Sequence, residues 1–421
     1  MIIDDFSASP PPTNPLRRAY AASIQLAKTK GEHRSRTLRS MAEAIRKRQN
    51  DILEANTLDL EASRELGVSE CVSEWLKLTP ERLDTTVQIL KRLGELPDPI
   101  GRVIGASYQL EQGQTYYQLI PIGVVGLIYE AFPEFGAIAA GLCMKTANSL
   151  ILLGGSEANY SNQVIADALQ SAIEEEGMPI GSLEVFPNEQ EAPIQDLVTQ
   201  DQYINLIIPY GRPHLVHQVV TQSTVPVLRS AMGNCYLYWS ATANVDMVRW
   251  MIFDSHQSKP DPVNAIEKVL IDPNQKGSSL VRLWNNLREE GFSLKGDELL
   301  VKQFPELILA EPSEWSQPYL NKTIAFRGVD SLDEGIAWMN EYSSGHSNCL
   351  ATESYSESRQ FALDVNSALT FINASPRFSR HQNRGDAIFL GMSNQVGYRR
   401  GLIGLDSLTT LKYIVQGNPL F

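Results

Sequence analysis

Several features that mark large classes of proteins are missing from this sequence. Its net charge is −13, so it has no basic excess with which to bind the phosphates of a nucleic acid. No apolar run reaches the ~18 residues that a membrane-spanning helix needs. The first residues are acidic and then proline-rich, without the basic and apolar segments of a signal peptide. We therefore expect a cytoplasmic protein that contacts neither nucleic acid nor membrane.

Cysteine and histidine are also scarce and widely spaced. The four cysteines, Cys71, Cys143, Cys235 and Cys349, form no C-x-x-C pair, which is typical of reduced thiols in a cytosolic protein. The six histidines show no spacing that would bring metal ligands together. The sequence therefore predicts no disulfide and no metal site.

The apolar content is sufficient for a sizeable core. The chain has 421 residues, of which 43% are hydrophobic and 20% are charged, and this length favours two or more domains. Residues 1–15, which are rich in serine and proline, predict a flexible lead-in. Apolar residues recur at helical spacing between 40 and 67, and Thr79 followed by Pro80 predicts the start of another helix.

From residue 102 onward the pattern indicates strands as well as helices. Residues 102–120 alternate between polar and apolar and contain a Gly-Gln pair, so they predict a β-hairpin. Short apolar strands then alternate with helices to about residue 224, which indicates a parallel sheet covered on both faces. A second α/β segment follows at 225–401, and a strand-like segment occupies 402–421.

One turn has the local features of a nucleotide-binding loop. Residues 150–158 predict a strand, a glycine turn and the start of a helix. Gly154 and Gly155 would let a ligand approach the backbone, and Ser156 and Glu157 would begin a helix whose amides favour phosphate. The turn is not a G-x-G-x-x-G motif, and a turn that only reverses the chain is the simpler interpretation of these residues alone.

Several long segments resemble one known family, in the same order along the chain. They are YQLIPIGVVGLIYEAFPEFGAIAAGLCMKTANSLILLGGSEAN, TVPVLRSAMGNCYLY, VDSLDEGIAWMNEYSSGHS, INASPRF and RGLIGLDSLTTLKYIVQGN. Together with the earlier NDILEANTLDLEASRELGVSE, they extend the resemblance over about residues 16–418. The family that they resemble is the γ-glutamyl phosphate reductases, which belong to the aldehyde dehydrogenase superfamily.

The resemblance implies an α/β, aldehyde-dehydrogenase-like fold in three parts. Residues 16–224 would form a Rossmann-like domain for NADP(H), and residues 225–401 would form a catalytic-type α/β domain. The hairpin at 102–120 and the strand at 402–421 would form a small β extension that joins subunits into a homo-oligomer. The implied reaction is the NADPH-dependent reduction of L-glutamyl 5-phosphate to L-glutamate 5-semialdehyde and phosphate, in proline biosynthesis.

The sequence departs from this family at the nucleophile. The family's cysteine thiolate attacks the acyl phosphate, and in an ungapped alignment Val263 stands at its position. Valine has no lone pair with which to attack. Glu134 stands where the resemblance implies an asparagine that holds the oxyanion, and a carboxylate there would repel the developing negative charge. Phe132, two residues earlier, replaces an arginine.

Other ligand-binding positions of the family are partly kept. For the cofactor, the resemblance points to Lys145, Gly154, Gly155, Ser156 and Glu157. For the substrate, it points to His346, Asn373 and Arg377. Departures in the cofactor region are Leu153 for a basic residue, Tyr210 and Arg212 for arginine and glycine, and Pro318 for a glutamate. In a later loop, an Asp-Gly-Gly segment and a glutamate are replaced by Arg380, His381, Gln382 and Phe389.

These observations lead to three interpretations. The chain could be an active reductase that uses direct hydride attack or Cys349 as a relocated thiol. It could instead be a catalytically inactive paralogue that binds a small-molecule metabolite, or pairs with a true reductase or with glutamate 5-kinase. The third interpretation, an enzyme of another class that uses Glu134, His256 and His381, is the least expected. The loss of the nucleophile favours the second interpretation.

Overall fold

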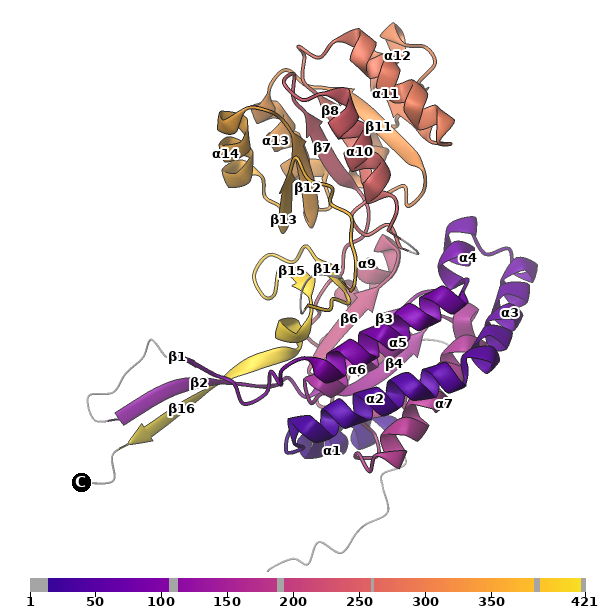
Figure 1. Ribbon diagram of the computed structural model, residues 1–421, viewed down its shortest axis with the longest axis vertical. Coiled ribbons are helices and arrows are strands. Elements are labelled where there is room, and N and C mark those ends of the chain that lie inside the picture. The colour runs from indigo at the N-terminus through magenta and orange to yellow at the C-terminus, as the bar shows by residue number, and fades with distance from the viewer. Residues whose placement is uncertain (1–13, 106–112, 188–192, 259–260, 382–386, 418–421) are drawn as a thin grey trace, which may run out of the picture. The chain divides into compact units, whose positions relative to one another are not determined.

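The computed structural model describes residues 14–105, 113–187, 193–258, 261–381 and 387–417. This part of the chain forms two compact α/β units (Figure 1). The first contains residues 14–228, 387–390 and 404–417, and the second contains residues 229–381 and 391–403. The boundaries predicted from the sequence lie at 224/225 and 401/402. They assign residues 387–390 to the second domain, whereas in the structure these residues belong to the first unit. Of the expected lead-in at 1–15, residues 1–13 lie outside the described residues.

Within the described residues, five helices precede the first sheet: α1 (Pro15–Leu26), α2 (Gly31–Lys47), α3 (Gln49–Glu65), α4 (Glu70–Leu76) and α5 (Pro80–Glu95). The helical pattern between 40 and 67 belongs to two helices, because α2 ends and α3 begins at Arg48, whose φ of −96° and ψ of 17° are not helical. Gly67, with a φ of +65°, follows the end of α3. The predicted start of α5 is confirmed, since the Thr79 hydroxyl accepts a hydrogen bond from the Arg82 amide at 3.3 Å.

A four-stranded parallel sheet forms the centre of the first unit. Its strands, in the order β5-β4-β3-β6, are β3 (Val124–Tyr129), β4 (Ser149–Gly154), β5 (Leu183–Val185) and β6 (Leu206–Tyr210). The connecting elements are α6 (Phe135–Lys145), η1 (Ser156–Ala158), α7 (Asn159–Glu175), α8 (Pro193–Val198) and α9 (Pro213–Gln222). Nearly all residues of β3, β4 and β6 are buried, which explains their continuous apolar runs. The strand order reverses between β3 and β6, where ligands of such sheets bind beyond the carboxyl ends.

A seven-stranded parallel sheet forms the centre of the second unit, in the order β10-β9-β11-β8-β7-β12-β13. The strands are β7 (Cys235–Trp239), β8 (Ile266–Ile271), β9 (Ser293–Gly296), β10 (Ile308–Leu309), β11 (Thr323–Gly328), β12 (Ser347–Ala351) and β13 (Leu369–Ile372). Its helices are α10 (Val245–Ser255), α11 (Gly277–Glu289), α12 (Glu298–Gln303), η2 (Pro312–Ser316), α13 (Leu332–Tyr342) and α14 (Tyr355–Asp364). Separate apolar cores lie on its two faces, one with α10 and α11 and one with α13 and α14. None of the helices in the described ranges is long and apolar enough to cross a membrane.

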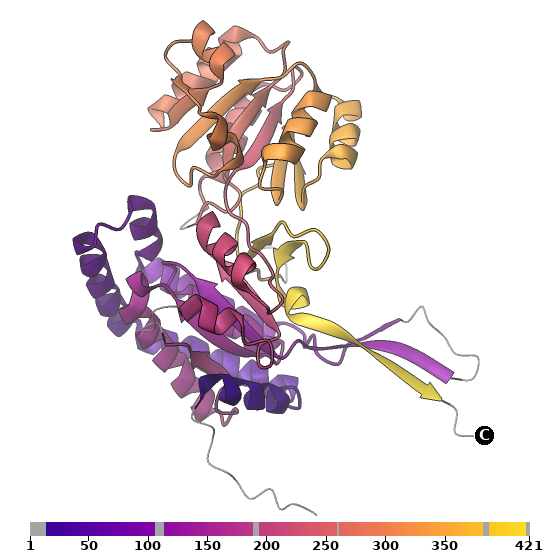
Figure 2. The same ribbon diagram turned by 180° about the vertical axis from the view of Figure 1, so that it is seen from behind.

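A narrow antiparallel sheet completes the first unit. It consists of β1 (Val103–Gly105), β2 (Gly113–Pro121) and β16 (Thr409–Gly417), in the order β1-β2-β16. The predicted hairpin is confirmed by the pairing of β1 with β2, although residues 106–112 lie outside the described residues. Figure 2 shows β2 and β16 side by side, and they pair from Thr409↔Pro121 to Gly417↔Gly113. The remaining elements are β14 (Gly391–Ser393), β15 (Gly401–Ile403) and η3 (Leu405–Leu408).

Candidate functional site

The carboxyl ends of β3 and β6 are joined by a network of charges around Glu130. Glu130 follows β3 directly, and its Oε2 accepts a hydrogen bond from the Arg212 amide at 2.8 Å. Its Oε1 lies 2.9 Å from Arg212 Nη2 and 3.4 Å from His214 Nε2. Gly211 permits this approach, because a Cβ there would lie only 2.6 Å from Glu130 Oε2. The Glu130 carboxylate therefore accepts the hydrogen bond of the Arg212 amide, just before α9, which an external anion would otherwise accept.

The predicted nucleotide turn follows β4, and its own glutamate covers it. Glu157 Oε1 accepts a hydrogen bond from the Ala131 amide at 2.7 Å, and a Cβ on Gly155 would lie 2.1 Å from the same oxygen. Ala131 has a φ of +45°, a left-handed conformation that is strained for a residue with a side chain. Burial is the main cause that raises the pKa of Glu157. A carboxylate therefore closes over the turn.

Lys145 does not join the other residues predicted to bind the cofactor. Gly154, Gly155, Ser156 and Glu157 lie together at the carboxyl end of β4. Lys145 is the last residue of the 11-residue helix α6, whose length of about 16 Å separates it from the start of that helix. The Lys145 Nζ donates to the Leu96 carbonyl and to Ser35 Oγ. Burial lowers the pKa of Lys145. This side chain ties α6 to the N-terminal helices at the opposite edge of the sheet.

Stacked aromatic rings fill the carboxyl edge of the same sheet. Phe132 stacks on Trp75 with ring centroids 4.9 Å apart, and it meets Tyr210 edge-on at 5.6 Å. Phe135 stacks on the other side of this group, 4.0 Å from Tyr210. All four rings are at most 2% exposed. Phe132 and Tyr210 stand where the family resemblance implies arginines, so packed rings take the place of two cations.

Glu134 is held by Arg82, a residue that the sequence did not single out as functional. Glu134 Oε1 accepts hydrogen bonds from Arg82 Nε at 3.0 Å and from Nη2 at 2.6 Å. Arg82 also donates to the Trp75 carbonyl at 3.0 Å, so the ion pair links α4, α5 and the start of α6. Glu134 Oε2 is buried and has no hydrogen-bond partner among the described residues. A buried carboxylate at this position favours positive charge and opposes an oxyanion.

In the second unit, the loop before β8 is built around Val263. Val263 is fully buried, and its carbonyl accepts a hydrogen bond from the Gly233 amide at 2.9 Å. The same carbonyl oxygen lies 2.7 Å from His346 Nε2, and His346 Nδ1 lies 2.8 Å from Ser344 Oγ. The backbone is thus firmly held at the position where the resemblance implies a nucleophile, while the side chain there has no nucleophilic atom.

The hydrogen bonds assign a neutral tautomer to His346. Because a carbonyl oxygen can only accept, Nε2 carries the proton that it donates to Val263. The Ser344 hydroxyl lies 2.8 Å from Nδ1 and also donates to the Gly233 carbonyl at 2.8 Å. Burial lowers the pKa of His346 to about 4, and the hydrogen bond to Val263 opposes this shift only in part. His346, predicted to bind substrate, therefore holds the backbone of the Val263 loop.

The two cysteines closest to this loop are not arranged as substitute nucleophiles. Cys235 is fully buried, with Sγ 3.4 Å from His346 Nε2 and 3.9 Å from the Val263 carbonyl oxygen. Cys349 lies on β12 and packs in the apolar core together with Leu237. Burial raises the pKa of both thiols. The hypothesis that Cys349 is a relocated thiol is therefore not supported, because the strand directs it into the core.

A buried ion pair secures the same loop. Both terminal nitrogens of the Arg380 guanidinium bond the Asp261 carboxylate, with Nη1 2.8 Å from Oδ1, and Asp261 is 1% exposed. Asn264 Nδ2 donates to the Pro376 carbonyl at 2.8 Å. Arg380, which replaces an acidic residue of the family, thus holds the later loop against the Val263 segment. Gln382 lies outside the described residues.

The three residues predicted to bind substrate do not form one group. His346 precedes β12 and Asn373 follows its parallel neighbour β13. The two residues therefore lie at opposite ends of these strands, ~16 Å apart along a five-residue strand. Both ends of the Asn373 amide bond the Thr352 backbone, at 2.9 and 2.7 Å. Arg377 is exposed and lies 3.4 Å from Asp254 Oδ1, near the end of α10. The structure therefore brings His346 and Arg377, without Asn373, to the edge that holds Val263.

Two of the three residues of the third interpretation, His256 and Glu134, have structural roles in their own units. His256 Nε2 lies 2.9 Å from the Ile266 carbonyl oxygen, and burial lowers the pKa of His256 to about 4. Glu134 is already paired with Arg82. His381 adjoins the Arg380–Asp261 pair, and its Nδ1 is buried without a hydrogen-bond partner among the described residues. Within the described ranges, no group of His, Cys, Asp and Glu could hold a metal ion.

Two of the residues that organise these sites could have been found from the sequence. Glu130 is an acidic residue directly after a buried apolar strand, a common position for a functional side chain in parallel sheets. Asp261 lies two residues before Val263, within the segment that the resemblance singled out. Arg82 gave no such signal, because its partner Glu134 is 52 residues away in the chain.

The chain is similar over its length to γ-glutamyl phosphate reductases. It is 52% identical over 403 residues to γ-glutamyl phosphate reductase 2 of Synechocystis sp., with 96% of each chain covered. The crystal structure of γ-glutamyl phosphate reductase from Thermotoga maritima matches it with a TM-score of 0.88 and 30% identity, over 97% of this chain and 98% of that one. The chain belongs to the γ-glutamyl phosphate reductase family.

The α/β, aldehyde-dehydrogenase-like fold expected from the resemblance is confirmed. An acetylating aldehyde dehydrogenase from Geobacillus thermoglucosidasius shares this fold with a TM-score of 0.67 at 17% identity, over 97% of this chain and 96% of that one. No model of a protein family matches the chain. As a member of the γ-glutamyl phosphate reductase family, the chain is related to oxidoreductases of proline biosynthesis.

Membership of the γ-glutamyl phosphate reductase family implies NADP(H), but the residues present do not fit its phosphates. A 2′-phosphate needs a cation, whereas Leu153, near the end of β4, is apolar and buried. Arg212, the cation that acts on Glu157, is already paired with Glu130. Glu157 is suited to accept from ribose hydroxyls, yet its carboxylate repels phosphate. The turn keeps its backbone geometry without the charge that NADP(H) requires.

Proposed function

We propose that this γ-glutamyl phosphate reductase family member does not catalyse the covalent reduction of L-glutamyl 5-phosphate, and that it acts in proline biosynthesis by binding. The observation that carries the proposal is Val263 at the position of the nucleophilic thiol, with its carbonyl held by Gly233 and His346. A thiolate must displace phosphate from the acyl carbon to form a thioester, and a valine methyl group cannot form that bond. Hydride then has no thioester to reduce.

The surrounding groups support the same proposal. Burial raises the pKa of Cys235 and of Cys349, so neither supplies a thiolate at neutral pH. Glu134 introduces negative charge at the oxyanion position, which also opposes direct hydride attack on the acyl phosphate. Losing a covalent nucleophile alone lowers the rate by several orders of magnitude.

We further propose that the chain works as an oligomer, with copies of itself, with a thiol-bearing reductase of the same family or with glutamate 5-kinase. The β extension supports this, because its outer strands β1 and β16 expose the apolar side chains of Val103, Ile104, Leu411, Tyr413 and Val415. An exposed apolar sheet edge favours pairing with another chain. The Synechocystis relative is named γ-glutamyl phosphate reductase 2. This number supports a role for such a chain beside another member of the same family.

Growth of a proline auxotroph tests the loss of catalysis in a cell. A host without its own γ-glutamyl phosphate reductase would express this chain or, as a positive control, a thiol-bearing member of the family. With equal protein levels confirmed by immunoblot, we predict growth without proline for the control alone. Growth supported by this chain would overturn the proposal.

Native mass spectrometry tests the proposed assembly. We predict that this chain forms a homo-oligomer, or a mixed oligomer with a thiol-bearing reductase or glutamate 5-kinase from its own genome. Tyr413→Lys with Val415→Lys should abolish that species, because both side chains are exposed on β16. Val281→Lys, an exposed apolar position on α11, is the matched control and should change nothing. A chain that stays monomeric alone and in both mixtures contradicts the proposed assembly.

A further inference from the structure

A groove of about 450 Å³ lies between α2 and α7 in the first unit. This volume is in the range of small-molecule binding sites. The bottom of the groove consists of small side chains, namely Ala44 from α2 and the buried Ala168 and Ala172 from α7. Small residues let a ligand approach both helices closely. The groove is separate from Glu130, Glu157 and the other residues of the carboxyl edge.

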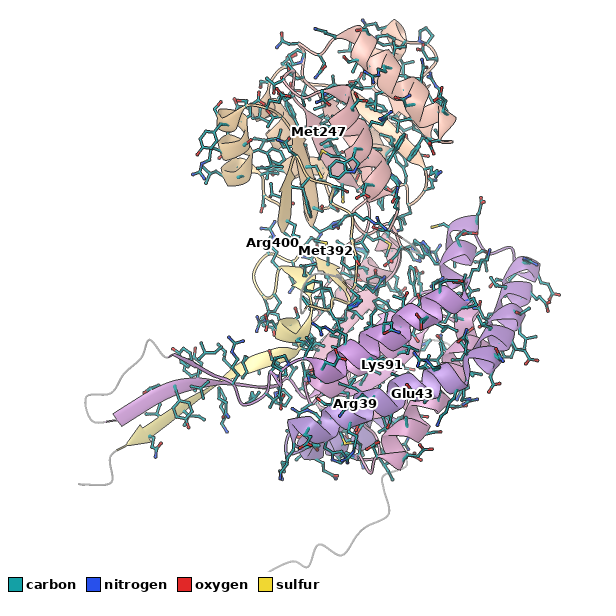
Figure 3. All side chains as sticks on the ribbon, viewed as in Figure 1. Arg39, Glu43, Lys91, Met247, Met392 and Arg400 are labelled. Carbon is teal, nitrogen blue, oxygen red and sulfur yellow. The ribbon has the colours of Figure 1, made fainter. Side chains whose placement is uncertain are left out.

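Cations outnumber carboxylates in this groove, although the chain as a whole has a net charge of −13. The basic residues that line it are Arg36, Arg39, Lys47 and Arg48, and the acidic residues are Glu43 and Glu175. Glu43 is engaged from α5 by Lys91, whose Nζ lies 2.9 Å from Glu43 Oε1 (Figure 3). That hydrogen bond lowers the pKa of Glu43. One of the two carboxylates is thus already neutralised by a residue outside the lining.

Two of the cations remain available for a ligand. Arg36 is paired with Glu176 at 2.6 Å and Arg48 with Asp51 at 3.3 Å. Over the part of the chain that the structure describes, neither Arg39 nor Lys47 has an ion pair within 4 Å, and Lys47 acts on Glu43 only as a minor electrostatic contribution. Both are exposed and line the groove. The hydroxyls of Ser40 and Ser171 already donate to Glu176 and Asp167, so recognition depends on the cations.

We propose that this groove binds a small anion with two or more negative charges, of the phosphate or dicarboxylate class. Arginine and lysine bind the oxygens of both classes through charge-assisted hydrogen bonds. The proposal does not rest on the loss of catalysis, because none of the groove residues takes part in reductase chemistry. The groove binds its anion whether or not the chain turns over substrate.

Isothermal titration calorimetry at low ionic strength tests this site on the full chain. Inorganic pyrophosphate and glutarate serve as probes for the two classes of anion. The Arg39→Gln/Lys47→Gln variant removes the two cations without ion pairs, and Ala44→Leu fills the groove without changing its charge. Lys28→Gln/Lys30→Gln is the matched control, because it removes two exposed cations outside the groove. Melting curves identify folded variants, and Ser171→Leu replaces Ala44→Leu if that variant is unfolded.

We expect at least one probe to bind the wild type and the control with equal affinity, and both groove variants at least tenfold more weakly. Binding by one probe alone supports the proposal and identifies the class of anion. Binding that persists in either folded groove variant shows that the charge is recognised elsewhere and overturns it. Binding lost equally in the control, or absent from the wild type with both probes, overturns it as well.

Discussion

The imidazole of His346 donates a hydrogen bond of 2.7 Å to the backbone carbonyl of Val263. This bond and the Gly233 amide fix the loop at which the γ-glutamyl phosphate reductase family has its nucleophile. The Arg380–Asp261 ion pair also holds this loop, two residues before Val263. The loop is therefore positioned by its backbone and its neighbours, and its geometry does not depend on the side chain that performs the family's chemistry.

Replacing His346 with glutamine should weaken the pH dependence of stability. The pKa of His346 is lowered to about 4 in the folded chain, against about 6.5 when unfolded, so the unfolded state binds its proton first. The contribution of His346 to the free energy of unfolding is fully present above pH ~6.5 and is lost as the pH falls toward 4. Between pH 7.5 and 5 this loss is about 2 kcal/mol. Urea unfolding at these two pH values measures it. Equal losses in wild type and His346→Gln would show that His346 titrates normally.

Replacing Arg82 with methionine should destabilise the first unit by about 3–5 kcal/mol, because it leaves the Glu134 carboxylate buried without its partner. The double variant Arg82→Met/Glu134→Leu should recover most of this loss, since it removes both charges. Denaturant midpoints with unchanged slopes provide the measurement. If the single variant is as stable as the wild type, the ion pair does not organise the start of α6.

Wild-type protein should bind NADPH only weakly, and Leu153→Arg should strengthen that binding at least about fivefold by supplying a cation for the 2′-phosphate. NADH lacks this phosphate, so its affinity should not change. Fluorescence titration with both nucleotides separates the two effects, after circular dichroism shows that the variant is folded. Tight NADPH binding by the wild type, or equal strengthening of NADH and NADPH, would contradict the fit deduced for the turn after β4.

The fold was largely predictable because its signals are local. Buried parallel strands such as β3 and β4 are continuous apolar runs, and each is followed by a helix. Thr79 at the N-cap and Pro80 at the first helical position define the start of α5. The break at Arg48 was missed, because α2 and α3 continue the same apolar periodicity on both sides of it. A short interruption of this kind changes the backbone without changing the pattern of side chains.

The site was less predictable because it depends on contacts between distant residues. The family resemblance points to Lys145 as a cofactor-binding residue, yet its position at the end of α6 directs it to Leu96 and Ser35. Asn373 lies in a motif of the family, but its amide is used by the Thr352 backbone. Spacing along the chain does not reveal which edge of a sheet a residue reaches. Only the strand register shows that Asn373 lies beyond the carboxyl end of β13, away from the Val263 loop.

The central claim, that the chain lacks the thiol chemistry of its family, is tested most directly by oxidation of L-glutamate 5-semialdehyde with NADP⁺ and phosphate. The protein would be purified from a host without its own γ-glutamyl phosphate reductase, alongside a Cys349→Ala variant and a thiol-bearing member of the family as positive control. We predict no NADPH formation above the enzyme-free baseline for wild type or variant, with full turnover in the control. Clear turnover by the wild type would contradict the account, and its loss in Cys349→Ala would identify a relocated nucleophile.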